Sequence, residues 1–217
     1  WLTYAFWGWT VLALSVLTST VIYSIIQKND ANGFTPFGIA AVLVLLPIAF
    51  VCDMLYIKKE PEVKHGAEMA IAAIHAVIFA LFAAGSLIVA VMSVITMLTN
   101  ARYDTSTVVT LVSALIIAVY YVLTFLRTLN LRQIIAFSNI YRYLMAVTVG
   151  IIVVLGITGP VANERITRND RLIESNLGQL TTKIANYTRE NKELPADLSS
   201  LDLAGDAQVL VTKNLVT

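Results

Sequence analysis

Long apolar stretches with few or no charged residues constrain the fold of this chain most strongly. Crossing about 30 Å of bilayer hydrocarbon takes about 20 helical residues. Five stretches are long enough, at residues 1–27, about 37–57, 69–99, about 107–126 and about 143–162. Because their Leu, Ile, Val and Ala residues do not alternate strictly with polar ones, the stretches predict helices rather than strands. The predicted fold is an all-α integral membrane bundle of about five transmembrane helices, formed by residues 1–162.

Charged residues are distributed unevenly along the chain. Of its 15 Lys and Arg and 14 Asp and Glu residues, 15 lie between Glu164 and Lys213. The others form short clusters between the apolar stretches. The 58% apolar and 13% charged content also departs from soluble domains, which average about 45–50% and about 25%. Residues 163–217 are therefore predicted to form a separate small tail domain, all-α or α+β, that begins with an amphipathic helix.

Basic residues in the connections predict the orientation. The second and fourth connections hold three each: Lys58, Lys59 and Lys64, and Arg127, Arg132 and Arg142. The first and third hold one each, Lys28 and Arg102. Because cytoplasmic loops carry an excess of Lys and Arg, we expect a multi-pass protein of the cytoplasmic membrane. Its N-terminus would be cytoplasmic and its tail, residues 163–217, extracytoplasmic.

The connection from Arg127 to Arg142 allows two interpretations. Its apolar residues mix with basic and amide residues at loosely helical spacing. It could lie in the inner membrane interface with its arginines toward anionic lipid, or it could extend the fourth helix to a turn. At the other end of the fifth stretch, the segment from Gly156 to Pro160 is predicted to loosen or kink the helix.

An amphipathic helix is predicted from Glu164 onward. Its apolar residues recur at steps of three, four and seven: Ile166, Ile173, Leu177, Leu180, Ile184 and Tyr187. This spacing forms one apolar stripe, and the part from Ile173 to Tyr187 is a candidate surface for binding a partner. Pro195 and the residue before it end helical patterns, so the helix is expected to stop near Asn191.

The run from Asn176 to Leu201 resembles part of bacterial type IV pilins and type II secretion pseudopilins. In those families a stalk helix leaves the membrane, ends in a turn before a proline, and leads to a Leu-x-x-Leu segment. The matching positions are Leu180, Ile184, Tyr187, Asn191, Leu194, Pro195, Leu198 and Leu201. The resemblance covers about 30 of the 217 residues, and the pilin opening Gly-Phe-Thr-Leu-x-Glu is missing. The whole layout resembles multispan bacterial membrane proteins of unknown function, which implies no activity.

Asp53 and His75 are the ionisable residues well inside the predicted spans. Antiparallel neighbouring helices would place them at similar depth, so they are a candidate polar pair. An unpaired charge there costs about 2.5–3.5 kcal/mol on insertion scales. The pair could form a proton or cation relay. Alternatively, it could be a structural hydrogen bond, or Asp53 could reach toward Lys58 near the interface.

Residues for catalysis or for cofactor binding form no recognisable constellation. The sequence lacks a His/Glu zinc pair, a phosphate-binding glycine loop and a nucleophile elbow, and its only cysteine is Cys52. We therefore expect no enzyme activity, no cofactor and no metal. A net charge of +1 gives no reason to expect nucleic acid.

Two functions remain open from the sequence. The first is a non-enzymatic membrane scaffold or assembly protein that presents a pilin-like helix for self-association or partner binding. The second is a small transporter or channel with Asp53 and His75 near its pathway. The expected partners are membrane lipid and either a second copy of the chain or another membrane or extracytoplasmic protein.

Overall fold

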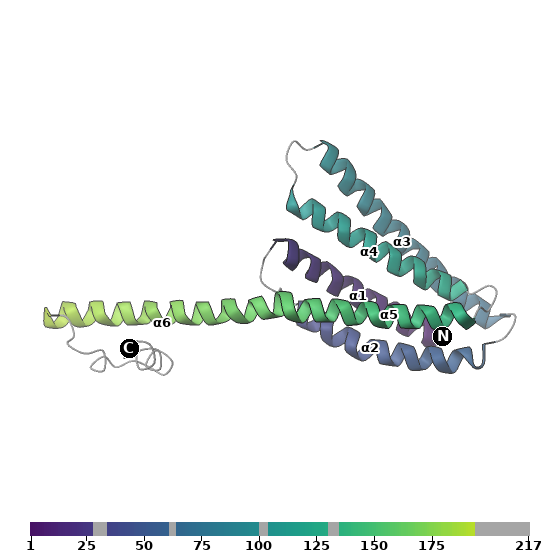
Figure 1. Cartoon of the computed structure of the whole chain (residues 1–217), viewed down its shortest axis with the longest axis horizontal. Helices are drawn as coiled ribbons and strands as arrows, with labels where there is room; N and C mark the ends of the chain where they lie inside the picture. Colours follow the sequence, from purple (N-terminus) through teal and green to yellow (C-terminus); the bar gives the residue numbers. More distant parts are fainter. Residues whose placement is uncertain (28–33, 61–63, 100–103, 130–134, 194–217) are drawn as a thin grey trace. The chain divides into compact units, whose positions relative to one another are not determined.

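The computed structural model describes residues 1–27, 34–60, 64–99, 104–129 and 135–193. Every secondary-structure element within those ranges is helical (Figure 1). The elements are α1 (Leu2–Gln27), α2 (Phe34–Ile57), α3 (Ala67–Thr99), α4 (Thr105–Leu129), α5 (Ile135–Gly156), the π-helical turn η1 (Ile157–Val161) and α6 (Ala162–Asn191). Five of the helices are long and apolar enough to cross a membrane. This confirms the predicted five-helix, all-α architecture and indicates a multi-pass membrane protein.

The chain divides into two compact units, Trp1–Asn163 and Glu164–Thr217. Helix α6 provides most of the described part of the second unit. The resemblance positions Leu194, Pro195, Leu198 and Leu201 lie outside the described residues, as does any strand of the predicted tail domain.

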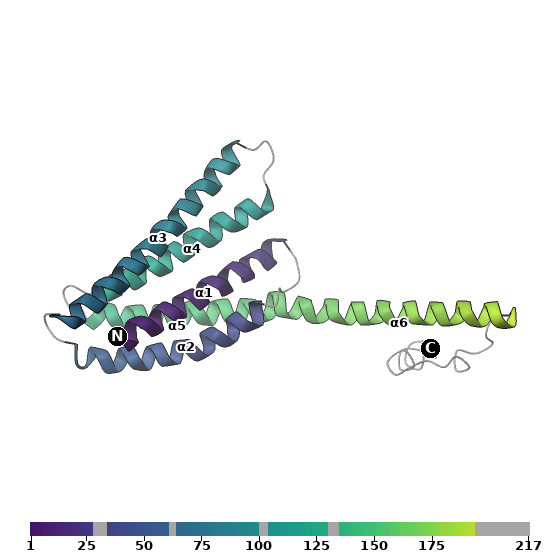
Figure 2. The same ribbon diagram turned by 180° about the vertical axis from the view of Figure 1, so that it is seen from behind.

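Helix α1 is the most buried helix of the first unit. It packs against α2 and α4 and also contacts α5, whereas α3 packs mainly against α4 (Figures 1 and 2). The side chains on the inward face of α1 are each at most 1% exposed. They are Trp7, Val11, Leu14, Leu17 and Val21. By contrast, α3 presents large apolar side chains outward, with Leu81 66% and Leu98 81% exposed. That surface is appropriate for contact with lipid chains.

The ends of α4 and α5 differ from the predicted ones. The fourth helix was expected to end at about 126 and the fifth to begin at about 143, but α4 continues to Leu129 and α5 begins at Ile135. Arg127 therefore belongs to α4, which agrees with the interpretation that the fourth helix extends to a turn, and Arg142 belongs to α5, which begins earlier than predicted. Both side chains are buried, and their charges lower local hydropathy without ending the helices.

Asp104 caps the start of α4. Its Oδ1 accepts a hydrogen bond from the Ser106 backbone N–H at 3.2 Å, and its Oδ2 accepts one from the Ser106 hydroxyl. These hydrogen bonds to the ionised form hold the pKa of Asp104 below its usual range. A carboxylate here also lies favourably at the positive end of the α4 dipole.

The path from α5 to α6 passes through η1, which contains Pro160. Proline lacks the backbone N–H of a regular helical turn, and a π-helical turn accommodates the break. The predicted loosening of the helix between Gly156 and Pro160 is thereby confirmed. Helix α6 ends at Asn191, as predicted. Lys192 follows with φ of 56°, the left-handed conformation that commonly terminates helices.

Gly38 allows α1 and α2 to approach closely. A Cβ atom at this position would lie 3.1 Å from the Leu17 Cβ and 3.4 Å from the Leu17 Cα. Small residues at such crossings let helix backbones pack together in membranes. Because part of the obstruction is backbone, a side-chain rotation alone cannot make room for a larger residue.

Replacing Gly38 with leucine should therefore destabilise the bundle by about 1–3 kcal/mol, the usual cost of overpacking. Unfolding of the purified protein in detergent micelles, titrated with sodium dodecyl sulfate, measures this loss. Gly150→Leu is a matched control, because nothing lies within 4 Å of a Cβ at that position of α5. Equal stability of the two variants would refute the close α1–α2 packing.

Candidate functional site

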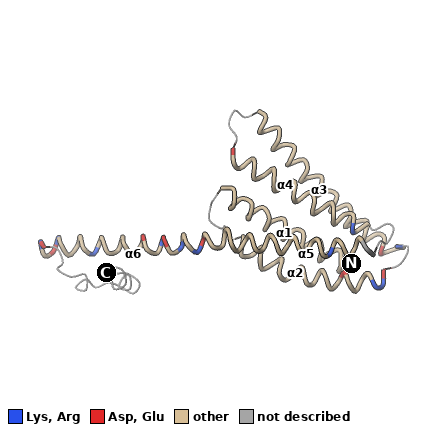
Figure 3. The backbone as a smooth tube through the Cα atoms, in the orientation of Figure 1, with Lys and Arg blue, Asp and Glu red and all other residues tan. Residues whose placement is uncertain are grey.

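Most of the described charged residues of the first unit lie at the end of the bundle where the N-terminus lies, whereas Asp104 lies at the other end (Figure 3). This end comprises the start of α1, the ends of α2 and α4, and the start of α5. We call the group formed by Asp53, Glu60, Lys64, Arg127 and Arg142 the buried charge cluster.

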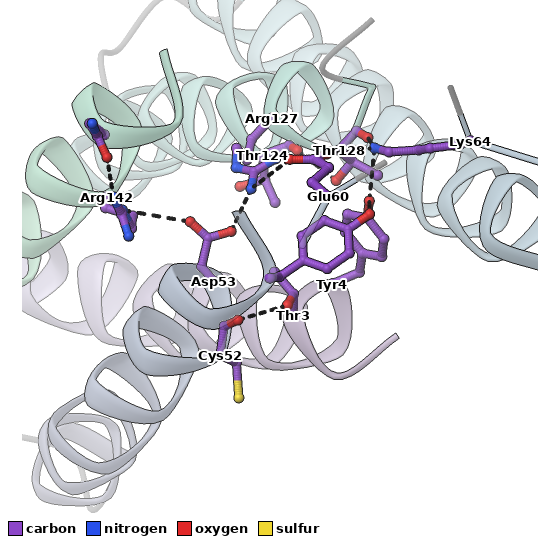
Figure 4. Close-up of polar contacts among 12 residues, drawn as sticks. Thr3, Tyr4, Cys52, Asp53, Glu60, Lys64, Thr124, Arg127, Thr128 and Arg142 are labelled. Atoms are coloured by element: carbon purple, nitrogen blue, oxygen red, sulfur yellow. Dashed lines mark hydrogen bonds and ion pairs between the residues drawn. The ribbon is translucent and has the colours of Figure 1, made fainter. Parts of the chain in front are cut away.

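Asp53 lies at the centre of this cluster and has no exposed surface. Arg127 Nη2 donates a hydrogen bond to Asp53 Oδ1 at 2.7 Å. Arg142 Nε lies 3.7 Å from the other carboxylate oxygen, Oδ2 (Figure 4). One carboxylate from α2 thus attracts guanidinium groups from α4 and α5.

Glu60 and Lys64 extend the cluster beyond the end of α2. Glu60 Oε2 lies 3.9 Å from Arg127 Nη2, and Glu60 Oε1 lies 3.0 Å from Lys64 Nζ. Lys64 also donates to the Tyr4 hydroxyl at 3.0 Å and to the Thr128 carbonyl at 3.4 Å. Three cations and two anions leave one net positive charge. Through Tyr4 the cluster reaches α1, so it joins four helices.

Neutral groups surround the ion pairs. The Tyr141 and Thr124 hydroxyls share a hydrogen bond of 2.9 Å, and the Tyr4 and Tyr56 hydroxyls share one of 3.2 Å. Trp7 packs edge-to-face on Tyr141 with ring centroids 4.8 Å apart. These aromatic side chains enclose the charges in an environment of low polarity, where attraction between opposite charges is stronger than in water.

Several polar atoms of the cluster have no hydrogen-bond partner among the described residues. They include Arg127 Nε and Nη1, Arg142 Nε and Asp53 Oδ2. Arg142 does donate through Nη2 to the Asn139 side-chain oxygen, and its guanidinium lies 5.3 Å from the Phe50 ring centroid. Charge attraction rather than a saturated hydrogen-bond network therefore holds the two arginines around Asp53.

His75 lies in a different environment from Asp53. Its Nδ1 is 2.9 Å from the Ile71 carbonyl oxygen, one turn earlier in α3. Its ring contacts those of Tyr4 and Phe79, with centroids 5.8 and 6.2 Å away. It also lines a cavity of about 350 Å³ between α1 and α3. The ion pairs of Asp53 are made with Arg127 and Arg142, and the contacts of His75 are made with other groups.

The candidate partner stripe lies entirely on α6. Ile173 and Leu177 are 43% and 55% exposed, and Leu180, Ile184 and Tyr187 are partly exposed. No residue of this helix is buried. The stripe and the charge cluster belong to different units of the chain.

Sequence reasoning missed the partners of Asp53, although a signal was present. An acidic residue inside a span needs a counter-charge, and Arg127 and Arg142 flank the fourth and fifth spans on the same predicted side as the end of the second span. Arg127 and Arg142 were counted only as loop charges and were not considered as counter-charges of Asp53. Glu60 and Lys64, four residues apart, gave a second signal.

Comparison with family models, with curated proteins and with solved structures finds no match to this chain. Within the described ranges, no group of three or more His, Cys, Asp or Glu residues is placed to hold a metal ion. The chemistry of the cluster is that of ion pairing between helices.

Asp53→Asn should lower the free energy of unfolding by about 3–5 kcal/mol, because removing one partner leaves buried charges uncompensated. Unfolding in detergent micelles measures the change. The triple variant Asp53→Leu, Arg127→Met and Arg142→Met should regain most of the loss, since apolar replacement of a buried ion triad is often neutral and Glu60 stays paired with Lys64. Wild-type stability of Asp53→Asn would show that the cluster does not hold the helices.

Proposed function

We propose that this protein is a non-enzymatic membrane scaffold in which the five-helix bundle anchors α6, and α6 associates with the same helix of a second copy. The observation that carries the proposal is the apolar stripe of α6, a helix with no buried residue. An amphipathic helix gains stability only when its apolar face is covered. A second copy offers an identical stripe.

The spacing of the stripe favours helix–helix pairing. Ile166, Ile173, Leu180 and Tyr187 follow one another at intervals of seven residues, and Leu177 and Ile184 lie four residues after the second and third of them. Apolar residues repeating in this way form the seam of a left-handed coiled coil. From Ile173 to Tyr187 the seam is about 21 Å long at 1.5 Å per residue.

The charges of α6 permit two copies to approach. The helix contains four acidic and five basic residues: Glu164, Asp170, Glu174 and Glu190, with Arg165, Arg168, Arg171, Lys183 and Arg189. Its net charge of +1 causes little repulsion, and its mixed signs allow ion pairs between neighbouring helices. The resemblance of this segment to pilin stalk helices agrees with a role in assembly.

The transport alternative has weaker support from the geometry. Asp53 has no exposed surface and is engaged by Arg127 and Arg142. Neither the cavity that His75 lines nor the larger one between α1, α3 and α4 is lined by Asp53. An anchor needs helices locked together, and the charge cluster provides such a lock.

Single cysteines in a Cys52→Ser background test self-association. Under mild oxidation in native membranes, cysteines at Leu177, Leu180 and Ile184 should give disulfide-linked dimers. Cysteines at Gln179 and Thr182 should give few, because they lie on the opposite face of α6. Absence of dimers from all three stripe positions would contradict pairing. Equal yields from both faces would show random collision.

We further propose that the N-terminus is cytoplasmic and that α6 lies outside the cytoplasmic membrane, as the loop charges indicate. In the same Cys52→Ser background, a membrane-impermeant maleimide added to intact cells should label a cysteine at Gln179. It should label one at Lys59 only after the cells are permeabilised. The reverse pattern would invert the orientation while leaving the pairing of α6 testable in isolated membranes.

A further inference from the structure

The charges of α6 are unevenly distributed along the helix and around its apolar stripe. Six of its nine charged residues lie between Glu164 and Glu174 (Figure 3). In a coiled coil the positions of each seven-residue repeat are lettered a to g, and positions a and d form the seam. Leu177 and Ile184 occupy a positions of α6 when the four apolar residues spaced by seven occupy d. Those d residues are Ile166, Ile173, Leu180 and Tyr187.

Asp170 interrupts the apolar a positions of this seam. It lies seven residues before Leu177 and therefore occupies the a position between Ile166 and Ile173. The side chain of Asp170 is exposed, and those of Ile166 and Ile173 are 60% and 43% exposed. Pairing through the stripe therefore encloses a carboxylate among apolar side chains.

The connection to the bundle determines the direction in which two α6 helices pair. Helix α6 begins at Ala162, directly after Val161 ends η1. Two copies anchored with the same orientation in one membrane therefore begin α6 at the same side of that membrane, and their helices run parallel. In a parallel two-stranded coil that is in register, an a residue faces the same residue of the second copy. Asp170 thus faces its own equivalent.

The charged groups that surround Asp170 in such a pair are acidic. Glu174, four residues later, occupies the e position beside the seam, and both copies contribute it together with Asp170. Lys183, 13 residues after Asp170, is the nearest basic residue of α6 at an a, d, e or g position. The closer basic residues occupy the outer positions c, f and b: Arg165, Arg168 and Arg171. The carboxylates therefore meet without a basic residue at the adjoining seam positions.

Two ionised carboxylates at one layer of the seam oppose pairing. Like charges close together disfavour their ionised forms, and enclosure among apolar side chains acts in the same direction. The paired copies consequently bind a proton at Asp170 more readily than separate copies do. Because the state that binds more protons is favoured as the pH falls, acidification favours the pair.

We propose that the α6 helices of two copies pair parallel and in register, and that the carboxylates of Asp170 make this pairing stronger at acidic pH. The inference rests on the proposed self-association of α6 and adds its direction and its regulation. At neutral pH the apolar layers from Ile173 to Tyr187 hold the pair, and the Asp170 layer weakens it. Protonation of that layer removes the repulsion.

Energy transfer between fluorophores on the full-length protein in phosphatidylcholine vesicles tests the proposal. A donor or an acceptor dye is attached to a cysteine at Gln179, on the outer face of α6, in the Cys52→Ser background. A chelator keeps divalent cations from bridging carboxylates. Over a series of protein-to-lipid ratios, lowering the pH from about 7.5 to about 4.5 should strengthen association about tenfold. Asp170→Asn should associate tightly at both pH values, since an asparagine is tolerated at an a position of a two-stranded coil.

Glu164→Gln is the matched control, because it removes a carboxylate of the same helix at a b position outside the seam. It should keep the pH dependence of the wild type. Equal association of the wild type at both pH values would overturn the role of Asp170 while leaving the pairing of α6 intact. Unchanged pH dependence in Asp170→Asn, or its loss in Glu164→Gln as well, would also overturn that role. Absence of energy transfer in every variant would instead contradict self-association itself, and this inference with it.

Discussion

The carboxylate of Asp53 is the group on which the arrangement of the bundle depends most. It has no exposed surface, yet it belongs to an apolar helix, α2, four residues before the helix ends. Arg127 from α4, at 2.7 Å, and Arg142 from α5, at 3.7 Å, provide the compensation. If α4 or α5 moved away from α2, charges would be left unpaired in a medium of low polarity. Apolar packing alone is much less restrictive, because lipid tails are as apolar as the side chains they would replace.

The number of helices could be read from the sequence because it follows from local physics. A stretch of about 20 apolar residues has few alternatives to a spanning helix, since its backbone hydrogen bonds must be satisfied internally. The end of α6 was equally accessible, because Pro195 ends helical pattern at short range. The start of α5 was placed too late, and the extension of α4 remained one of two interpretations, for the opposite reason. Arg127 and Arg142 resemble loop residues when only their own sequence neighbours are considered, and the Asp53 carboxylate that compensates their charges is far away in the chain.

The contacts of the candidate site could not be predicted because they join residues far apart in the chain. Asp53 and Arg127 are separated by 74 positions, and no periodicity relates them. The sequence did identify Asp53 as a buried charge in need of a partner, and it suggested His75 on the basis of similar depth. Depth alone does not determine which helices are neighbours. In the structure α2 contacts α1 and α5, while α3 packs mainly on α4, so His75 faces Tyr4 and Phe79 instead.

The charge cluster and the cavity between α1, α3 and α4 lie toward different ends of the first unit. The cluster holds α2, α4 and α5 together at the end where the N-terminus lies, and Lys64 connects them to Tyr4 of α1. No comparable ion pair among the described residues joins α1 to α3 or α4 beyond Gly85. Weaker contacts remain there, such as the 3.3 Å approach of the Thr18 and Tyr120 hydroxyls. A bundle fixed electrostatically at one end can separate at the other, where a cavity of about 640 Å³ lies between α1, α3 and α4. One strong interaction thus both anchors the helices and leaves room between them.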